Sequence, residues 1–103
     1  MVREQGDLLT IEETPTGCRL TGEVDATTAD RLETFIAEHV RPDEDFIVDC
    51  SGLTFMDSSG LHAILRAAGR MAGGALVFRG CGPSIRRLFD VAGVEEMAPV
   101  VIE

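Results

Sequence analysis

Short, fully apolar segments alternate with helical patterns along this chain, and this alternation limits the folds that it can adopt. Residues 46–48 (Phe-Ile-Val) and 75–78 (Ala-Leu-Val-Phe) are apolar without interruption, which is typical of strands that are buried on both faces. Between and after these segments, apolar residues recur every three or four positions, as they do on one face of a helix. Helices that connect buried strands predict right-handed crossovers and a mostly parallel sheet.

Eight elements are predicted in the order strand, strand, helix, strand, helix, strand, helix and strand. Pro15 and Gly17 supply the backbone angles of a tight turn, so the first two strands should pair as a hairpin. The three helices are expected to start after Thr28, Asp57 and Gly82. The five strands are expected over residues 8–13, 18–21, 45–50, 75–78 and 99–102.

The expected fold class is α/β, with one domain over residues 1–103. The sheet should be mixed and mostly parallel, with the hairpin at its edge and the helices packed on it. A chain of 103 residues has room for one hydrophobic core. Because the chain has no Trp and no Tyr, Leu, Ile, Val and Ala must build most of that core.

The charge of the chain excludes two classes of partner. The formal net charge is −9, from 18 acidic and 9 basic residues, and it would repel both a nucleic acid backbone and an anionic membrane surface. The first twenty residues contain no apolar run of the kind that a signal peptide needs, and no stretch of about 18 apolar residues occurs in the sequence. We therefore expect a soluble, cytoplasmic protein that binds neither nucleic acid nor membrane.

The cysteines are interpreted as ordinary core residues. Cys18, Cys50 and Cys81 are odd in number, and none of them forms a C-x-x-C pair. In a reducing compartment, free cysteines are mostly small buried apolar residues. We therefore predict no disulfide, metal site or cofactor from them.

The segment FMDSSGL, residues 55–61, is the candidate functional site. It lies between a predicted strand and a predicted helix, so Asp57 or Ser58 should cap the helix. In open α/β sheets, ligands and partners approach the loops at the carboxyl ends of the strands. Spacing alone favours a simple helix cap, because Asp and Ser oxygens accept hydrogen bonds from the free amides of a first turn.

Three separated segments resemble the STAS domain of bacterial anti-sigma factor antagonists. They are residues 53–61 (LTFMDSSGL), 20–25 (LTGEVD) and 85–93 (IRRLFDVAG), and they occur in the order expected for that family. Because the resemblance extends over residues 8–96, it is far more specific than any one short motif.

The resemblance implies a switch based on partner exchange. Members of the family bind an anti-sigma factor, often one with serine kinase activity, and so release a sigma factor for transcription. The kinase inactivates the antagonist by phosphorylating the serine after the motif aspartate, and a serine phosphatase reverses this step. By this resemblance the phosphorylated residue is Ser58, with Ser59 as the second candidate.

The predicted partner-binding residues come from two loops. The first group surrounds the candidate phosphorylation site, and the second follows the second predicted strand. They are Asp57, Ser58, Ser59, Gly60 and His62 in the first group, and Gly22, Glu23 and Asp25 in the second. An exposed acidic turn is more often only solvated, so the second group is the weaker prediction.

His62 departs from the family pattern, which usually has a small residue at this position. It lies four residues after Ser58, so two interpretations are possible: a Ser/His nucleophilic pair or an exposed surface histidine. We favour the surface histidine and predict that the chain is not an enzyme, because no oxyanion loop or G-x-S-x-G context accompanies the pair.

Two further questions stay open at this point. One alternative function is a STAS interaction or ligand-sensing scaffold, in which Ser58 only caps the helix. Many relatives also continue past the position of Glu103 into another helix, so we expect apolar surface here that a partner, a second copy or nothing covers. The expected state is therefore a monomer or a weak dimer.

Overall fold

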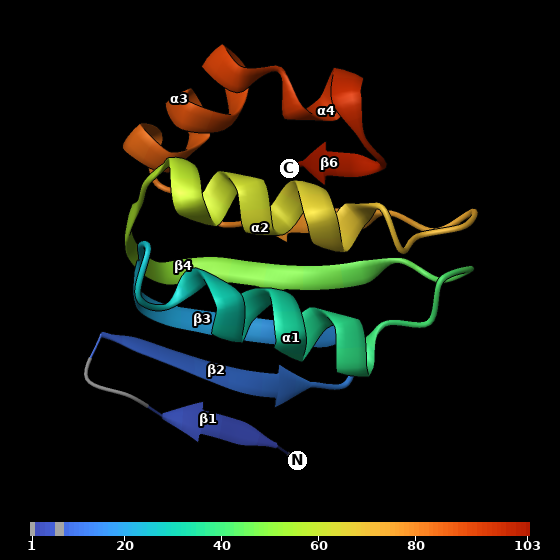
Figure 1. Cartoon of the computed structure of the whole chain (residues 1–103), viewed down its shortest axis with the longest axis horizontal. Helices are drawn as coiled ribbons and strands as arrows, with labels where there is room; N and C mark the ends of the chain where they lie inside the picture. Colours follow the sequence, from blue (N-terminus) through green and yellow to red (C-terminus); the bar gives the residue numbers. More distant parts are fainter. Residues whose placement is uncertain (1, 6–7) are drawn as a thin grey trace.

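The computed structural model describes residues 2–5 and 8–103 and places them in one mixed sheet with helices packed against it (Figure 1). The strands are β1 (Arg3–Gln5), β2 (Leu9–Thr14), β3 (Gly17–Val24), β4 (Phe46–Met56), β5 (Leu76–Arg79) and β6 (Val100–Ile102). The helices are α1 (Ala29–His39), α2 (Ser58–Ala68), α3 (Pro83–Ala92) and α4 (Val94–Met97).

The six strands lie in the sheet in the same order as in the chain. The pairs β1–β2 and β2–β3 are antiparallel, whereas β3–β4, β4–β5 and β5–β6 are parallel. Each parallel pair needs a crossover, and α1, α2 and the α3–α4 segment supply them. The predicted α/β class with a mixed, mostly parallel sheet is thus confirmed.

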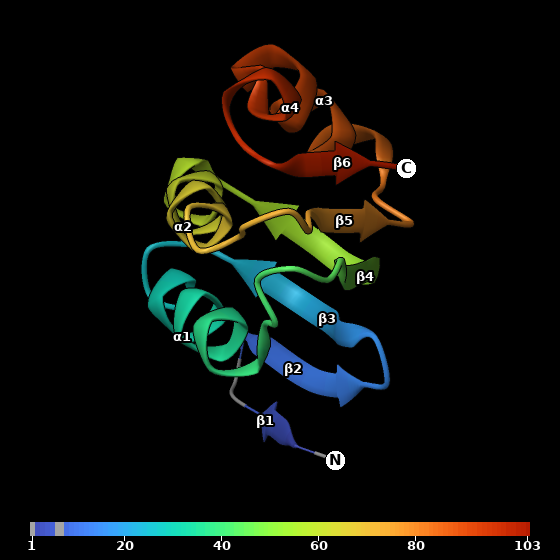
Figure 2. The same ribbon diagram turned by 90° about the vertical axis from the view of Figure 1, so that its right-hand side faces the viewer.

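Helices α1 and α2 lie side by side over the same face of the sheet, and α3 and α4 lie beyond them near β6 (Figures 1 and 2). The strand pleat explains the inner layer, because Phe46, Val48 and Cys50 of β4 are buried while Ile47 and Asp49 between them are partly exposed. The buried stripes of the helices are Ala29, Leu32, Phe35 and Ile36 on α1, and Gly60, Leu61, Ala63, Ile64, Ala67 and Ala68 on α2.

Strand β4 is longer than the sequence predicted. A strand was expected over residues 45–50, but β4 continues to Met56. Its second half mixes buried Leu53 with exposed Ser51 and Thr54, so it contains no continuous apolar run that could reveal it. It is held instead by parallel pairing with β3, which also extends beyond its predicted end to Val24.

Two short elements were not predicted. Strand β1 pairs with the outer side of the predicted hairpin, with Arg3 beside Glu12, so β1 rather than the hairpin takes the sheet edge. Its three residues are polar and give no strand pattern. Helix α4 follows Gly93, which ends α3 in the left-handed conformation with φ of 66°, as its position in the sequence indicated.

Gly60 lets α2 start close to the ends of β3 and β4. A Cβ atom at this position would lie 2.7 Å from Met56 Cγ and 2.8 Å from Val24 Cγ1. Both contacts are closer than carbon atoms tolerate, so a larger residue would push the first turn of α2 away from the sheet.

We predict that Gly60→Ala is less stable than the matched variant Gly69→Ala by about 1–3 kcal/mol. Gly69 has helical backbone angles at the other end of α2, so both variants lose similar freedom in the unfolded chain and only Gly60→Ala adds the clash. Urea unfolding followed by circular dichroism measures the difference. Equal midpoints for the two variants would contradict this account of α2 packing.

Candidate functional site

Asp57 caps helix α2 at the carboxyl end of β4. Its backbone is extended, and its Oδ1 atom accepts hydrogen bonds from the Ser59 amide at 2.9 Å and from the Gly60 amide at 3.4 Å. The sequence left Asp57 and Ser58 open as the cap, and the structure assigns that position to Asp57. The carboxylate thus satisfies two of the free amides of the first turn.

Ser58 is the first residue of α2, and its side chain is exposed. Ser59, the next residue, is half-buried and donates its amide to the Asp57 cap. Of the two candidate serines, Ser58 is therefore the one that another protein can reach more easily.

The parallel pairing of β3 with β4 brings the second predicted loop to the same place. Glu23 pairs with Phe55 and Val24 pairs with Met56, and the Asp57 amide donates to the Val24 carbonyl at 3.2 Å. Asp25, which follows Val24, therefore lies beside the start of α2. The two predicted groups of residues, more than thirty positions apart in the chain, are adjacent.

Asp25 is held in place by a network within its own loop. Its Oδ1 atom accepts from the Thr27 amide at 2.8 Å and from the Thr27 hydroxyl at 2.7 Å. The hydroxyl of the buried Thr28 accepts from the Asp25 amide at 2.9 Å and donates to the Glu23 carbonyl at 3.1 Å. Hydrogen bonds from Thr27 lower the pKa of the Asp25 carboxyl, so this group is ionised at neutral pH.

Gly22 shapes this loop through its backbone. Its φ of 106° is in the region that favours glycine, and a Cβ atom here would lie 2.0 Å from the Leu8 carbonyl oxygen. Gly22 is thus required for the backbone path of β3. The polar group that this part of the loop offers to a partner is the half-exposed side chain of Glu23.

Phe55 is an exposed aromatic residue at this site that the sequence did not predict. Strict alternation from the buried Leu53 would also bury Phe55, but the register with β3 shifts, so that Gly22 pairs with Leu53 and Glu23 with Phe55. The extra residue, Thr54, donates its hydroxyl to the Gly22 carbonyl at 3.0 Å. This bulge turns Phe55 outward and leaves it 45% exposed.

The other two predicted contact residues lie on α2. Gly60 is buried against Met56 and Val24, so it contributes by letting the helix start close to the strands. His62 is exposed one turn after Ser58, as expected for a surface histidine.

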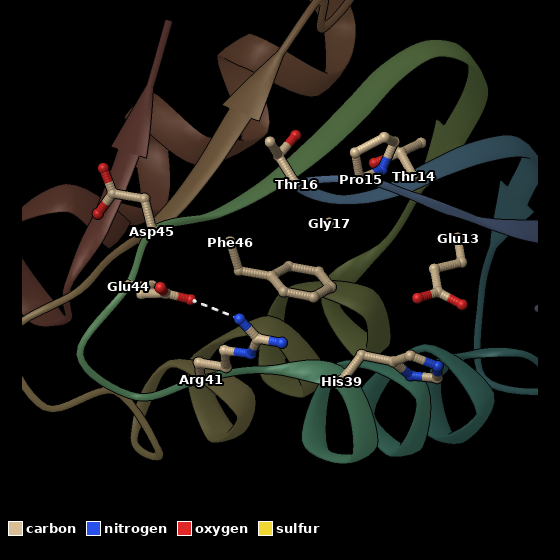
Figure 3. Close-up of a pocket in the computed structure, with 10 residues that line it drawn as sticks. All are labelled: Glu13, Thr14, Pro15, Thr16, Gly17, His39, Arg41, Glu44, Asp45 and Phe46. Carbon is tan, nitrogen blue, oxygen red and sulfur yellow. Dashed lines mark ion pairs between the residues drawn. The ribbon is translucent and has the colours of Figure 1, made fainter. Parts of the chain in front are cut away.

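A well-formed hollow among the described residues lies elsewhere. It has a volume of about 550 Å³, and its lining includes Phe46, His39 and the hairpin turn at Thr16 (Figure 3). Arg41 and Glu44 form an ion pair of 3.6 Å at its rim. Since Phe46 begins β4 and Ser58 follows its end, about 33 Å of strand separates this hollow from the serine loop.

Two features are absent from the described residues. No group of three or more His, Cys, Asp and Glu side chains in residues 2–5 and 8–103 is placed to hold a metal ion. In the same residues, no helix has the length and apolar character needed to cross a membrane.

Comparisons with known proteins agree on one family. The model of the STAS domain family matches residues 9–101. A curated relative, the anti-sigma F factor antagonist of Paenibacillus polymyxa, is 34% identical over 89 residues, which cover 80% of this chain and 74% of the relative.

Solved structures share the fold. An anti-sigma factor antagonist from Mycobacterium paratuberculosis superposes with a TM-score of 0.66 at 25% identity, covering 90% of this chain and 83% of its own. The antagonist SpoIIAA in its unphosphorylated form gives 0.61 at 19% identity, covering 92% and 86%. The Bacillus cell fate determinant SpoIIAA in the phosphorylated form gives 0.56 at 20% identity, covering 92% and 90%.

We predict that Asp57→Ala lowers the free energy of unfolding by about 1 kcal/mol, because the amides of Ser59 and Gly60 lose their acceptor. The control is Asp57→Asn, whose side-chain oxygen keeps the cap and should stay within a few tenths of a kcal/mol of the parent chain. Guanidinium unfolding measures both. An Asn variant as unstable as the Ala variant would show that charge, rather than capping, accounts for the effect.

Proposed function

The chain belongs to the STAS domain family, and we propose that it is an anti-sigma factor antagonist whose binding is switched by phosphorylation of Ser58. In this proposal the unphosphorylated chain acts in the cytoplasm, where it binds an anti-sigma factor with serine kinase activity and releases a sigma factor. The kinase then phosphorylates Ser58 and ends the interaction, and a serine phosphatase restores the active form.

One observation carries the proposal: the exposed hydroxyl of Ser58 lies at the start of α2, in the loop where two acidic segments meet. A partner that covers this edge must contact Ser58 and the neighbouring loop of Glu23 and Asp25. The exposed ring of Phe55 adds an apolar contact beside them. The curated relative carries the name anti-sigma F factor antagonist, which supports the class of partner.

Electrostatics make this position effective for a switch. A phosphate group adds about −1.5 to −2 charges. If a partner carboxylate lies about 8 Å away at an effective dielectric of about 40, the added repulsion is roughly 2 kcal/mol, or about thirtyfold in affinity. The ionised Asp25 and the Asp57 carboxylate already make this edge acidic, so the phosphate adds negative charge where a like charge on the partner is least tolerated, and its bulk adds to the charge effect.

The fold should survive the modification. The helix dipole favours a negative group at the first turn of α2. The Ser59 and Gly60 amides are already bonded to Asp57, so they do not draw the phosphate into the loop, and it would stay on the surface. SpoIIAA in its unphosphorylated and phosphorylated forms shares this fold with the chain.

The alternative function, a scaffold or ligand-sensing module, assigned Ser58 to the helix cap. Asp57 makes those cap hydrogen bonds, so the helix does not need Ser58 as its cap, as the alternative assumes. The hollow lined by Phe46 and His39 lies at the opposite end of β4, and ligand binding there would not involve Ser58.

We predict that the anti-sigma factor captured by this chain from its own cells, supplied with Mg-ATP, adds about 80 Da to the chain, the mass of one phosphoryl group. Intact-mass measurement and peptide mapping should place the group on Ser58. Ser58→Ala should abolish the mass increase, whereas the matched variant Ser59→Ala should keep it. A mass increase that persists in Ser58→Ala would overturn the assignment.

We also predict that phosphorylation of Ser58 weakens binding to the captured anti-sigma factor by roughly thirtyfold, while Ser58→Ala binds as the unphosphorylated chain does. Ser58→Asp should weaken binding less, because it adds a single charge. Ser84→Asp is the matched control, since Ser84 is an exposed serine in the first turn of α3. Isothermal titration calorimetry measures the affinities, and equal values for Ser58→Asp and Ser58→Ala would show that charge repulsion is not the main cause.

A further inference from the structure

Cys50 and Cys81 lie on neighbouring segments of the sheet. In the parallel pair β4–β5, Asp49 lies beside Arg79, the last residue of β5. Cys50 is therefore the next residue of β4 at the point where the chain leaves β5. Gly80 then turns the chain with φ of 73°, and a Cβ atom there would lie 3.2 Å from Ser51 Cβ and 3.3 Å from the Ser51 amide nitrogen. Gly80 thus lies close against β4, and the next residue, Cys81, packs against the core cluster that contains Cys50. A hydrogen bond between the two thiols contributes to the pKa shifts of both.

The two thiols differ in access to solvent. Cys50 is fully buried under the helices, whereas Cys81 is half-buried in the loop between β5 and α3. The third cysteine, Cys18, is fully buried on β3. A small oxidant in solution can therefore reach Cys81 before it reaches either of the other two.

The two thiols also differ in acidity. The hydrogen bond donated by Cys50 lowers the pKa of Cys81, and the positive charge of Arg86 lowers it further. The same hydrogen bond, together with burial, raises the pKa of Cys50. Cys81 is therefore the more acidic thiol of the pair, and its place just before the N-cap of α3 also favours the thiolate form.

We propose that Cys50 and Cys81 are a peroxide-oxidisable dithiol, in which Cys81 is the reactive thiolate and Cys50 is the resolving thiol. In the first step, Cys81 Sγ attacks one oxygen of hydrogen peroxide, an S–O bond forms, the O–O bond breaks, and the leaving hydroxide takes a proton to become water. Cys81 is oxidised by two electrons to a sulfenic acid, and the peroxide is reduced.

In the second step, Cys50 Sγ attacks Cys81 Sγ. An S–S bond forms, the S–O bond breaks, and hydroxide leaves with the proton of Cys50 as a second water. Once Cys81 is a neutral sulfenic acid, the anion that kept the proton on Cys50 is gone, so Cys50 can attack. The sum is two thiols and one peroxide giving one disulfide and two waters, and the disulfide ties β4 to the start of α3.

The test is to treat the reduced chain with equimolar hydrogen peroxide under argon. Intact mass should fall by about 2 Da, and peptide mapping should show a Cys50–Cys81 disulfide in the unmutated chain. Cys50→Ser should stop at a sulfenic acid on Cys81, which dimedone traps, and Cys81→Ser should give neither product. The control Cys18→Ser should still lose about 2 Da.

Arg86 offers a second, independent readout in a chain with all three cysteines. Arg86→Gln should slow oxidation roughly two- to fivefold by reducing the thiolate fraction of Cys81, whereas the neighbouring Arg87→Gln should not. An unchanged mass in the unmutated chain, a disulfide that contains Cys18, or faster alkylation of Cys18 than of Cys81 would each overturn the proposal.

Discussion

The parallel pairing of β3 with β4 is the constraint on which the rest of the structure depends. It extends from Gly17 beside Ile47 to Val24 beside Met56, and it joins the antiparallel part of the sheet to the parallel part. Because both strands end at the same edge, α1 and α2 start there and lie side by side (Figure 1). The candidate site is a product of this pairing, since neither loop alone brings Asp25, Asp57 and Ser58 together.

Most of the fold could be predicted because its local signals agree with one another. The apolar runs at Phe46 and Leu76, the turn at Gly17 and the helix end at Gly93 each mark an element that the structure contains. What the sequence did not predict depends on pairing between distant residues. The second half of β4 is mixed in polarity and is a strand because β3 lies beside it, and the polar β1 is a strand because β2 offers it a free edge.

The same distinction applies to the candidate site. The motif around Asp57 gave the cap and the exposed serine, since capping is a local interaction between a side chain and the next amides. The exposure of Phe55 could not be predicted, because it results from a bulge in which Thr54 has no opposite residue on β3. The cysteine pair was also missed: Cys50 and Cys81 are thirty-one positions apart, and the close approach of Gly80 to β4 brings their segments together.

Because β4 is longer than β5, it lies beside two chemically different sites, the cysteine pair of Cys50 and Cys81 and the loop of Ser58. Strand β5 pairs with β4 only as far as Asp49, and beyond this point the Asp49 carboxylate accepts the Ser51 amide at 2.9 Å and the Ser51 hydroxyl at 2.7 Å. The chain that leaves β5 turns here, and the half-buried Cys81 packs against the core cluster that contains Cys50. From Ser51 on, β4 continues with β3 as its strand partner and carries the start of α2 to the edge of the sheet. Oxidation at the first place would therefore act on packing inside the fold, whereas phosphorylation at the second would act on the surface that a partner contacts.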